Sequence, residues 1–174
     1  MARPTIPPTG VERIWPEHLL IVSKTDTKGI ITYANSVFCE VAGYTPAELE
    51  GQNHNIIRHP DMPRCVFKLL WDTIAAGEEI FAYVINQAKN GDHYWVFAHV
   101  TPTFDDAMRI IGYHSSRRVP SKAAVAKAKG LYAELLAIEA RHASPKDGLA
   151  AASAALGDVL KASKIDYDEF VFSL

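Results

Sequence analysis

Residues 54–63 gather several chemically versatile side chains on one short segment. The run reads HNIIRHPDMP and carries His54, Arg58, His59 and Asp61. The planar fork of an arginine matches pairs of phosphate oxygens, so Arg58 is a candidate for holding a phosphate-bearing ligand. A histidine with an ordinary pKa of about 6.5 can hydrogen-bond a ligand and make its affinity depend on pH. These residue types predict a ligand-binding segment.

Structural roles are also open to the same side chains. Arg58 can form an ion pair with Asp61 or lie at the surface, and a single histidine such as His59 is more often a hydrogen-bonded structural group. Asp61 lies shortly before Pro63 and the next expected helix. That position favours Asp61 as the N-cap of the helix, a role that is compatible with positioning the segment for a ligand.

Two further candidates lie beyond this segment. Trp71 falls on an expected helix over residues 64–76, where its flat indole can stack on a ligand ring or pack in the core. The helical pattern does not decide between the two. Asn86 lies on an expected strand, where its amide can both donate and accept hydrogen bonds or can serve as a polar strand end.

Large side chains alternate along the strand over residues 93–103. Trp95 and Phe97 alternate with Tyr94 and Val96, so one pair faces the ligand side of the sheet and the other faces outward. Exposed large aromatic rings need a cover. We expect the region around Trp15, or another subunit, to supply it.

The expected elements place these residues in an α+β arrangement. Strands over 19–23 and 30–34 form a hairpin, followed by short helices over 35–42 and from the capping box at Thr45, and by the helix over 64–76. Strands over 79–88, 93–103 and 109–117 follow, with Asn90-Gly91 in the first connecting turn. Antiparallel strands with helices on one face form a layered α+β domain, which can hold a small ligand between its layers.

Composition excludes several classes of protein. The chain has 174 residues, 48% of them apolar, with 18 Lys and Arg against 20 Asp and Glu. A net charge of −2 argues against a nucleic-acid binder. No apolar run approaches the length of a membrane span, and the start lacks the pattern of a secretory signal. The two cysteines fit neither a disulfide framework nor a metal site, which indicates a reducing compartment and predicts a cytoplasmic protein.

Composition also divides the chain into three parts. Residues 1–17 form an N-terminal leader or cap, of which residues 1–10, rich in proline and glycine, are expected to be disordered. Residues 18–118 form the α+β domain. Residues 119–174 contain 14 alanines in 56 positions and predict two helices, capped by Ser121 and Ser144. The apolar end over 167–172 is expected to dock on this chain or on a partner.

Several stretches resemble one known family. The run DTKGIITYANSVFCEVAGYTPAELEGQ resembles a PAS sensory domain. HNIIRHPDMP, LLWDTI and KNGDHYWV resemble the flavin-binding PAS domain of Aer-type aerotaxis receptors over residues 18–118. The resemblance implies a PAS fold, with a five-stranded antiparallel sheet and short helices on one face, here followed by a C-terminal helical extension. Without a membrane segment or a methyl-accepting domain, the chain looks more like a PAS-only energy-taxis sensor.

The resemblance also implies a cofactor, a role and a partner. Non-covalent FAD binding and a response to redox state are implied, with relay to a chemoreceptor or another signalling protein. We expect a homodimer that does not bind nucleic acid and does not insert directly into a membrane. The candidate cofactor-binding residues are His54, Arg58, His59, Asp61, Trp71, Asn86, Asn35 and Tyr94. One stretch departs from the family: Phe81-Ala82-Tyr83 replaces Trp-Ser-Gly, and Tyr83 is expected to add bulk to a strand lining the cleft.

Other chemistries remain as alternatives. A photocycle of the LOV class needs a cysteine in the motif GxNCRFLQ, and residues 51–56 contain none. PAS domains also hold haem, for which His93, His99 and His114 on expected strands are possible ligands. A cofactor-free dimerisation module is the third possibility. No serine-triad elbow, Walker loop or dinucleotide glycine motif is present, so we expect no enzyme.

Overall fold

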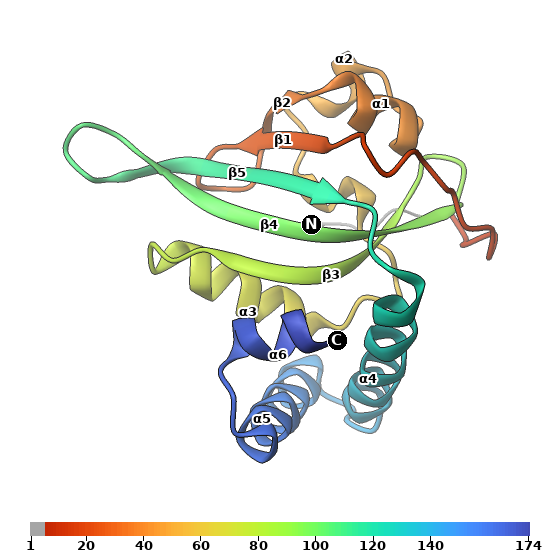
Figure 1. The fold of residues 1–174 in the computed structure, drawn as a ribbon, viewed down its shortest axis with the longest axis vertical. Helices are drawn as coiled ribbons and strands as arrows, with labels where there is room; N and C mark the ends of the chain where they lie inside the picture. Colours follow the sequence, from red (N-terminus) through yellow and green to blue (C-terminus); the bar gives the residue numbers. More distant parts are fainter. Residues whose placement is uncertain (1–5) are drawn as a thin grey trace.

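Residues 6–174 are described by the computed structural model of the protein, and they build one five-stranded antiparallel sheet with helices (Figure 1). The strands are β1 (Ile21–Thr25), β2 (Ile31–Ala34), β3 (Ile80–Gln87), β4 (His93–Phe104) and β5 (Ile110–Arg118). Their spatial order is β2-β1-β5-β4-β3, which leaves β2 and β3 at the edges. This arrangement confirms the expected PAS-type sheet, and the strand ends differ from the prediction by one or two residues.

Three short helical segments and one longer helix lie between β2 and β3. They are α1 (Ser36–Ala42), α2 (Pro46–Leu49), the 3₁₀ helix η1 (His54–Ile57) and α3 (Arg64–Ala75). Asn35 caps α1, since its side-chain oxygen accepts from the N–H of Phe38 at 3.0 Å. The capping box of α2 is present, with the Glu48 carboxylate accepting from the N–H of Thr45 at 2.9 Å. The short helix η1 was not predicted.

The N-terminus of α3 corrects one prediction. Pro63, not Asp61, is the N-cap residue of this helix, and it supplies no side-chain acceptor. The acceptor comes instead from Glu139, whose Oε1 accepts from the N–H of Cys65 at 3.0 Å. Glu139 is 75 positions away from Arg64, and its Oε2 accepts from the Arg64 Nε at 2.8 Å. A carboxylate from the C-terminal part of the chain therefore caps the helix that covers the sheet.

Three helices follow the sheet, one more than predicted. They are α4 (Lys122–Ala140), α5 (Pro145–Ser163) and α6 (Tyr167–Ser173). Ser121 and Ser144 begin the first two, as the sequence predicts. Figure 1 shows all three on the β3 side of the sheet, with α5 farthest from it.

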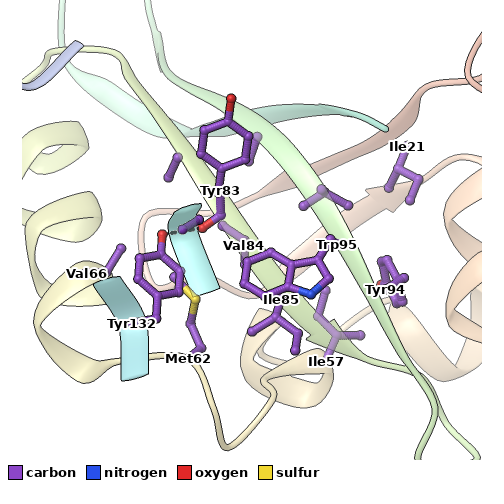
Figure 2. Close-up of a cluster of buried hydrophobic side chains, with 14 of the residues drawn as sticks. Ile21, Ile57, Met62, Val66, Tyr83, Val84, Ile85, Tyr94, Trp95 and Tyr132 are labelled. Atoms are coloured by element: carbon purple, nitrogen blue, oxygen red, sulfur yellow. Dashed lines mark hydrogen bonds between the residues drawn. The ribbon is translucent and has the colours of Figure 1, made fainter. Parts of the chain in front are cut away.

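The C-terminal helices cover the outer face and the exposed edge beside β3. Tyr132 of α4 stacks on Trp95, with ring centroids 6.1 Å apart, and its hydroxyl donates to the backbone carbonyl of Tyr83 at 2.5 Å (Figure 2). Phe172 of α6 packs on Phe97 at 5.6 Å. The chain's own C-terminal helices thus supply cover that was expected from the Trp15 region or another subunit, and Trp15 itself is buried in the same hydrophobic cluster as Trp95.

The N-terminal segment is held against the β3–β4 turn. The N–H of Thr9 donates to the carbonyl of Gly91 at 2.9 Å. The side-chain amide of Gln87 donates to the carbonyl of Ile6 at 2.9 Å. The prediction of a disordered leader is therefore wrong for residues 6–10, and residues 1–5 of that leader lie outside the described residues.

Candidate functional site

A cavity of about 400 Å³ lies between the sheet and the helical layer formed by η1 and α3. Its sheet wall is built from alternate residues of four strands, which include the small side chains Ser23, Ala98 and Ser115. The register of the strands explains why these small residues share one face of the sheet, because Ser23 is paired with Ser115 and Ala98 with Arg117. Since side chains alternate between faces of a strand, small residues on one face leave room for a ligand. The cavity volume lies within the range of small-molecule sites.

Strand alternation also corrects the expectation for Tyr83. Val84 lines the cavity, whereas Tyr83 packs on Phe97 with ring centroids 4.8 Å apart. In Figure 2, Tyr83 and Val84 project from neighbouring positions of the same strand in different directions. The departure from the family at Tyr83 therefore adds its bulk to the outer face and leaves the cleft unobstructed.

His54 belongs to a buried polar chain at one end of the cavity. Its Nε2 lies 3.2 Å from the hydroxyl oxygen of Ser23, and that oxygen also accepts a hydrogen bond from Arg117. Burial, reinforced by the positive charge of Arg117, lowers the pKa of His54 to about 3. The imidazole is thus neutral at physiological pH, and the part of it that lines the cavity can donate or accept one hydrogen bond.

Arg117, on β5, is the most deeply buried charged member of this group of polar side chains and is only 2% exposed. Its guanidinium lies over the ring of Phe38, 4.6 Å from the centroid. Burial lowers the pKa of Arg117 to about 10, so it stays charged at neutral pH. Two of its three nitrogens, Nε and Nη1, have no hydrogen-bond partner among residues 6–174. Among residues 6–174, Arg117 forms no salt bridge.

Arg58 and Asn86 are backbone neighbours beside the cavity. Arg58 follows η1, and its backbone pairs with that of Asn86 on β3. Its guanidinium lies 4.4 Å from the centroid of the Phe67 ring on α3. Asn86 is 4% exposed, and both residues line the cavity. A cation and an amide therefore lie along this wall of the cavity.

Trp71 lines the cavity, which decides the question that the helical pattern left open. It is 37% exposed and meets Tyr113 edge to face, with ring centroids 5.6 Å apart. A Cβ built on Gly29 would come within 2.9 Å of the indole, so Gly29 makes room for this ring. The indole thus forms part of the cavity wall as a flat apolar surface.

The charged side chains that line the cavity are cations. Its described lining contains Arg58, Arg64, Lys68 and Arg117, and no Asp or Glu. Arg64 is paired with Glu139, and Lys68 with Asp72, so the charge is least compensated at Arg117. Leu149 of α5 completes the wall. A ligand with negative or electron-rich groups fits this lining better than a cation does.

Four of the eight candidate binding residues line the cavity, namely His54, Arg58, Trp71 and Asn86. The other four lie elsewhere in the domain and do not line it. Asn35 caps α1 and also accepts from the N–H of Val22 at 3.0 Å, which ties α1 to β1. Tyr94 is fully buried on β4, with its hydroxyl unpartnered within residues 6–174.

His59 and Asp61 shape the loop that carries Arg58. His59 is 3% exposed, and its Nδ1 accepts from the N–H of Asp61 at 3.1 Å. Burial lowers the pKa of His59. The carboxylate of Asp61 lies at the surface, with its side chain 74% exposed. Both residues support the turn behind the cavity wall instead of facing a ligand.

The sequence reading missed Arg117 and Ser23, although a signal for them exists. Tyr113, Ser115 and Arg117 occur at every second position of β5 and share one face. An arginine on the same strand face as an inward-facing aromatic residue indicates a buried charge. Such a charge is rare unless it has a function or an ion-pair partner. Which face of β5 points inward depends on its pairing with β1 and β4, and those strands are distant in sequence.

Comparison with known proteins identifies the family that this fold belongs to. Residues 31–116 match the family described as PAS fold. The aerotaxis receptor of Escherichia coli K12 is 44% identical over 115 residues, which cover 66% of this chain and 22% of that protein. Residues 31–116 form a PAS domain. The resemblance to aerotaxis receptors is confirmed, and it concerns their PAS region only.

Other relatives of this PAS domain are also signalling proteins. The nitrogen fixation regulatory protein of Klebsiella pneumoniae is 32% identical over 97 residues, which cover 56% of this chain and 20% of that protein. The aligned residues thus span about a fifth of each of these two relatives.

Solved structures agree on the fold. The LOV domain of the blue-light photoreceptor Aureochrome1, in its light state, has a TM-score of 0.56 at 22% identity, covering 62% of this chain and 87% of that one. The PAS domain of the fruit-fly ELK potassium channel has a TM-score of 0.52 at 15% identity, covering 57% of this chain and 85% of that one. At such identities the likeness shows the fold alone.

Across residues 6–174, no helix combines the length and the apolar character that crossing a bilayer requires. The same residues contain no group of three or more His, Cys, Asp or Glu that could hold a metal ion.

Proposed function

We propose that this chain is a cytoplasmic redox sensor that binds FAD non-covalently in the PAS cavity and passes the redox state to a chemoreceptor or another signalling protein. The observation that carries the proposal is the cavity itself. It combines four cationic residues, the amide of Asn86 and a flat indole wall, and it contains no carboxylate among its described lining residues. The relation to an aerotaxis receptor supports the same assignment.

The residues present fit a flavin. Trp71 offers a flat surface to an aromatic ring system, and Asn86 offers an amide that can donate to one redox state and accept from another. Arg58, Arg64 and Lys68 suit the phosphates of a flavin nucleotide. When bound, the flavin would supply reversible electron transfer; the protein residues hold it, orient it and respond to its charge.

The signal must leave the cavity through this chain's own contacts. Asn86 lies on β3, whose outer face and edge carry the contacts to Tyr132 and α6. A redox-dependent difference of about 1–3 kcal/mol between two arrangements of these contacts would be enough to switch a partner. We propose that the sensor works as a homodimer and catalyses no reaction.

The first alternative, a haem sensor, is less well supported. His93, His99 and His114 are absent from the cavity lining. His99 lies on the outer face, stacked on Phe81 with ring centroids 4.2 Å apart. A photocycle based on a cysteinyl flavin is also disfavoured, because neither Cys39 nor Cys65 lines the cavity.

The test is the visible spectrum of freshly purified protein, followed by denaturation and identification of the released molecule. Flavin absorption bands and released FAD are expected. A double variant, Trp71→Ala with Arg58→Ala, should bind FAD much more weakly than wild type. Tyr33→Ala with Arg109→Ala is the matched control, because both side chains are exposed and lie outside the cavity.

Three other results would contradict the flavin assignment or its site. A Soret band would replace the flavin assignment with haem. A colourless protein that stays colourless when FAD is added, yet self-associates, would replace it with an interaction module. Undiminished FAD binding by the double variant would show that the flavin lies outside this cavity.

A further inference from the structure

Arg117 holds an unusual position for a charged group. It is 2% exposed, and its side chain donates a hydrogen bond to the hydroxyl oxygen of Ser23. Nε and Nη1 have no acceptor among the described residues. Burying a charge without a counter-ion is costly, so native proteins pair such groups or direct them toward a ligand.

The groups around Arg117 do not neutralise it. The neighbours from β1 and η1 are the hydroxyl of Ser23 and the neutral imidazole of His54. From α1 comes the ring of Phe38, and from β4 come Ala98, paired with it in register, and the phenol of Tyr94. Burial raises the pKa of Tyr94, so that phenol is uncharged.

The hydrogen bonds between Arg117, Ser23 and His54 occupy one side of the guanidinium. Arg117 can only donate, so the oxygen of Ser23 accepts from it, and the hydroxyl hydrogen of Ser23 is free to point at Nε2 of His54, 3.2 Å away. Neither neighbour therefore brings negative charge. Arg117, Ser23 and His54 all line the cavity, so the uncompensated charge of Arg117 lies close to any ligand held there.

We propose that the uncompensated positive charge of Arg117, at the wall of the cavity, attracts the most electronegative edge of the cavity ligand. The site consequently favours ligands, and redox states of a ligand, that carry negative charge at that edge. For the identity of the ligand this rests on the proposed flavin function. For a flavin it means that the reduced form, which gains negative charge, binds more tightly than the oxidised form because of Arg117.

A structural arginine and a ligand-binding arginine differ in what their removal does. Replacing a buried charge by an apolar side chain of similar volume is often neutral or stabilising. Arg117→Met should therefore leave the melting temperature of ligand-free protein unchanged or raise it, while flavin affinity falls at least tenfold. Arg118→Met is the matched control, since the next residue of the same strand is exposed.

The redox readout is independent of the affinity for oxidised flavin. If Arg117→Met weakens binding of reduced flavin tenfold more than binding of oxidised flavin, the two-electron midpoint potential falls by about 30 mV. Arg117→Lys keeps the positive charge and should therefore retain most of the midpoint potential.

Two results would overturn the proposal. One is a ligand-free Arg117→Met protein that melts well below wild type, because Arg117 would then be a structural group. The other is unchanged flavin affinity and unchanged potential in Arg117→Met. A wild-type protein that binds no flavin would instead refute the proposed function, and the melting temperature of ligand-free Arg117→Met would still test whether Arg117 is a structural group.

Discussion

Glu139 joins the C-terminal helices to the PAS domain, and its removal should loosen both. Its side chain is 6% exposed, one oxygen pairs with Arg64 at 2.8 Å, and the other caps α3 through the N–H of Cys65 at 3.0 Å. Glu139→Ala removes both interactions, whereas Glu139→Gln keeps an acceptor for the cap and removes only the charge. The two variants therefore separate the two roles.

The magnitude follows from these contacts. Losing a helix cap costs about 1 kcal/mol. Breaking a buried ion pair costs about 3–5 kcal/mol, but Arg64 is 28% exposed and water can solvate it, so we take about 2 kcal/mol. We expect Glu139→Ala to lower the free energy of unfolding by about 3 kcal/mol and the melting temperature by roughly 9 °C. For Glu139→Gln we expect about half of that.

Urea unfolding measures the free energy, and thiol labelling of Cys65 locates the opening. Burial, with the negative charge of Glu139 as a smaller cause, raises the pKa of the Cys65 thiol to about 12. In a Cys39→Ser background, Cys65 should react with a thiol reagent slowly in wild type and much faster in Glu139→Ala. Glu134→Gln, an exposed position on the same helix, is the control. A wild-type urea midpoint for Glu139→Ala, or equal losses for both substitutions, would refute this reasoning.

Two further predictions concern pH and helix packing. Because the folded pKa of His54 is about 3 and the unfolded value about 6.5, the unfolded state alone takes up a proton between these values. Stability should therefore fall as pH drops from 6.5 toward 3, by at most about 1.4 kcal/mol per pH unit, and His54→Gln should reduce this slope in urea titrations at several pH values. A Cβ built on Gly148 would lie 2.5 Å from the backbone carbonyl oxygen of Glu139, so Gly148→Ala should separate α4 from α5 and speed Cys65 labelling. Gly157→Ala, where nothing lies within 4 Å, should leave the labelling rate unchanged, and equal rates for both variants would contradict the packing argument.

The amino-acid sequence by itself determined the local elements and the family. Alternation of side chains, the Asn90-Gly91 turn and the caps at Thr45, Ser121 and Ser144 act over a few residues, so they can be read without knowing the fold. The segment HNIIRHPDMP carried enough specific information to predict both the PAS family and the two cavity residues His54 and Arg58.

Only the tertiary structure decided which side chains meet across the chain. Arg117 enters the cavity because β5 pairs with β1 and β4, and Glu139 caps a helix that begins 75 positions earlier. The same long-range register turns Tyr83 away from the cleft, where it packs on Phe97. A periodic pattern shows that one face of an element is buried, but the partner that buries it is chosen by the packing of the whole domain. For that reason local patterns alone could not assign the buried arginine or the capping glutamate to their sites, whereas they could assign the loop.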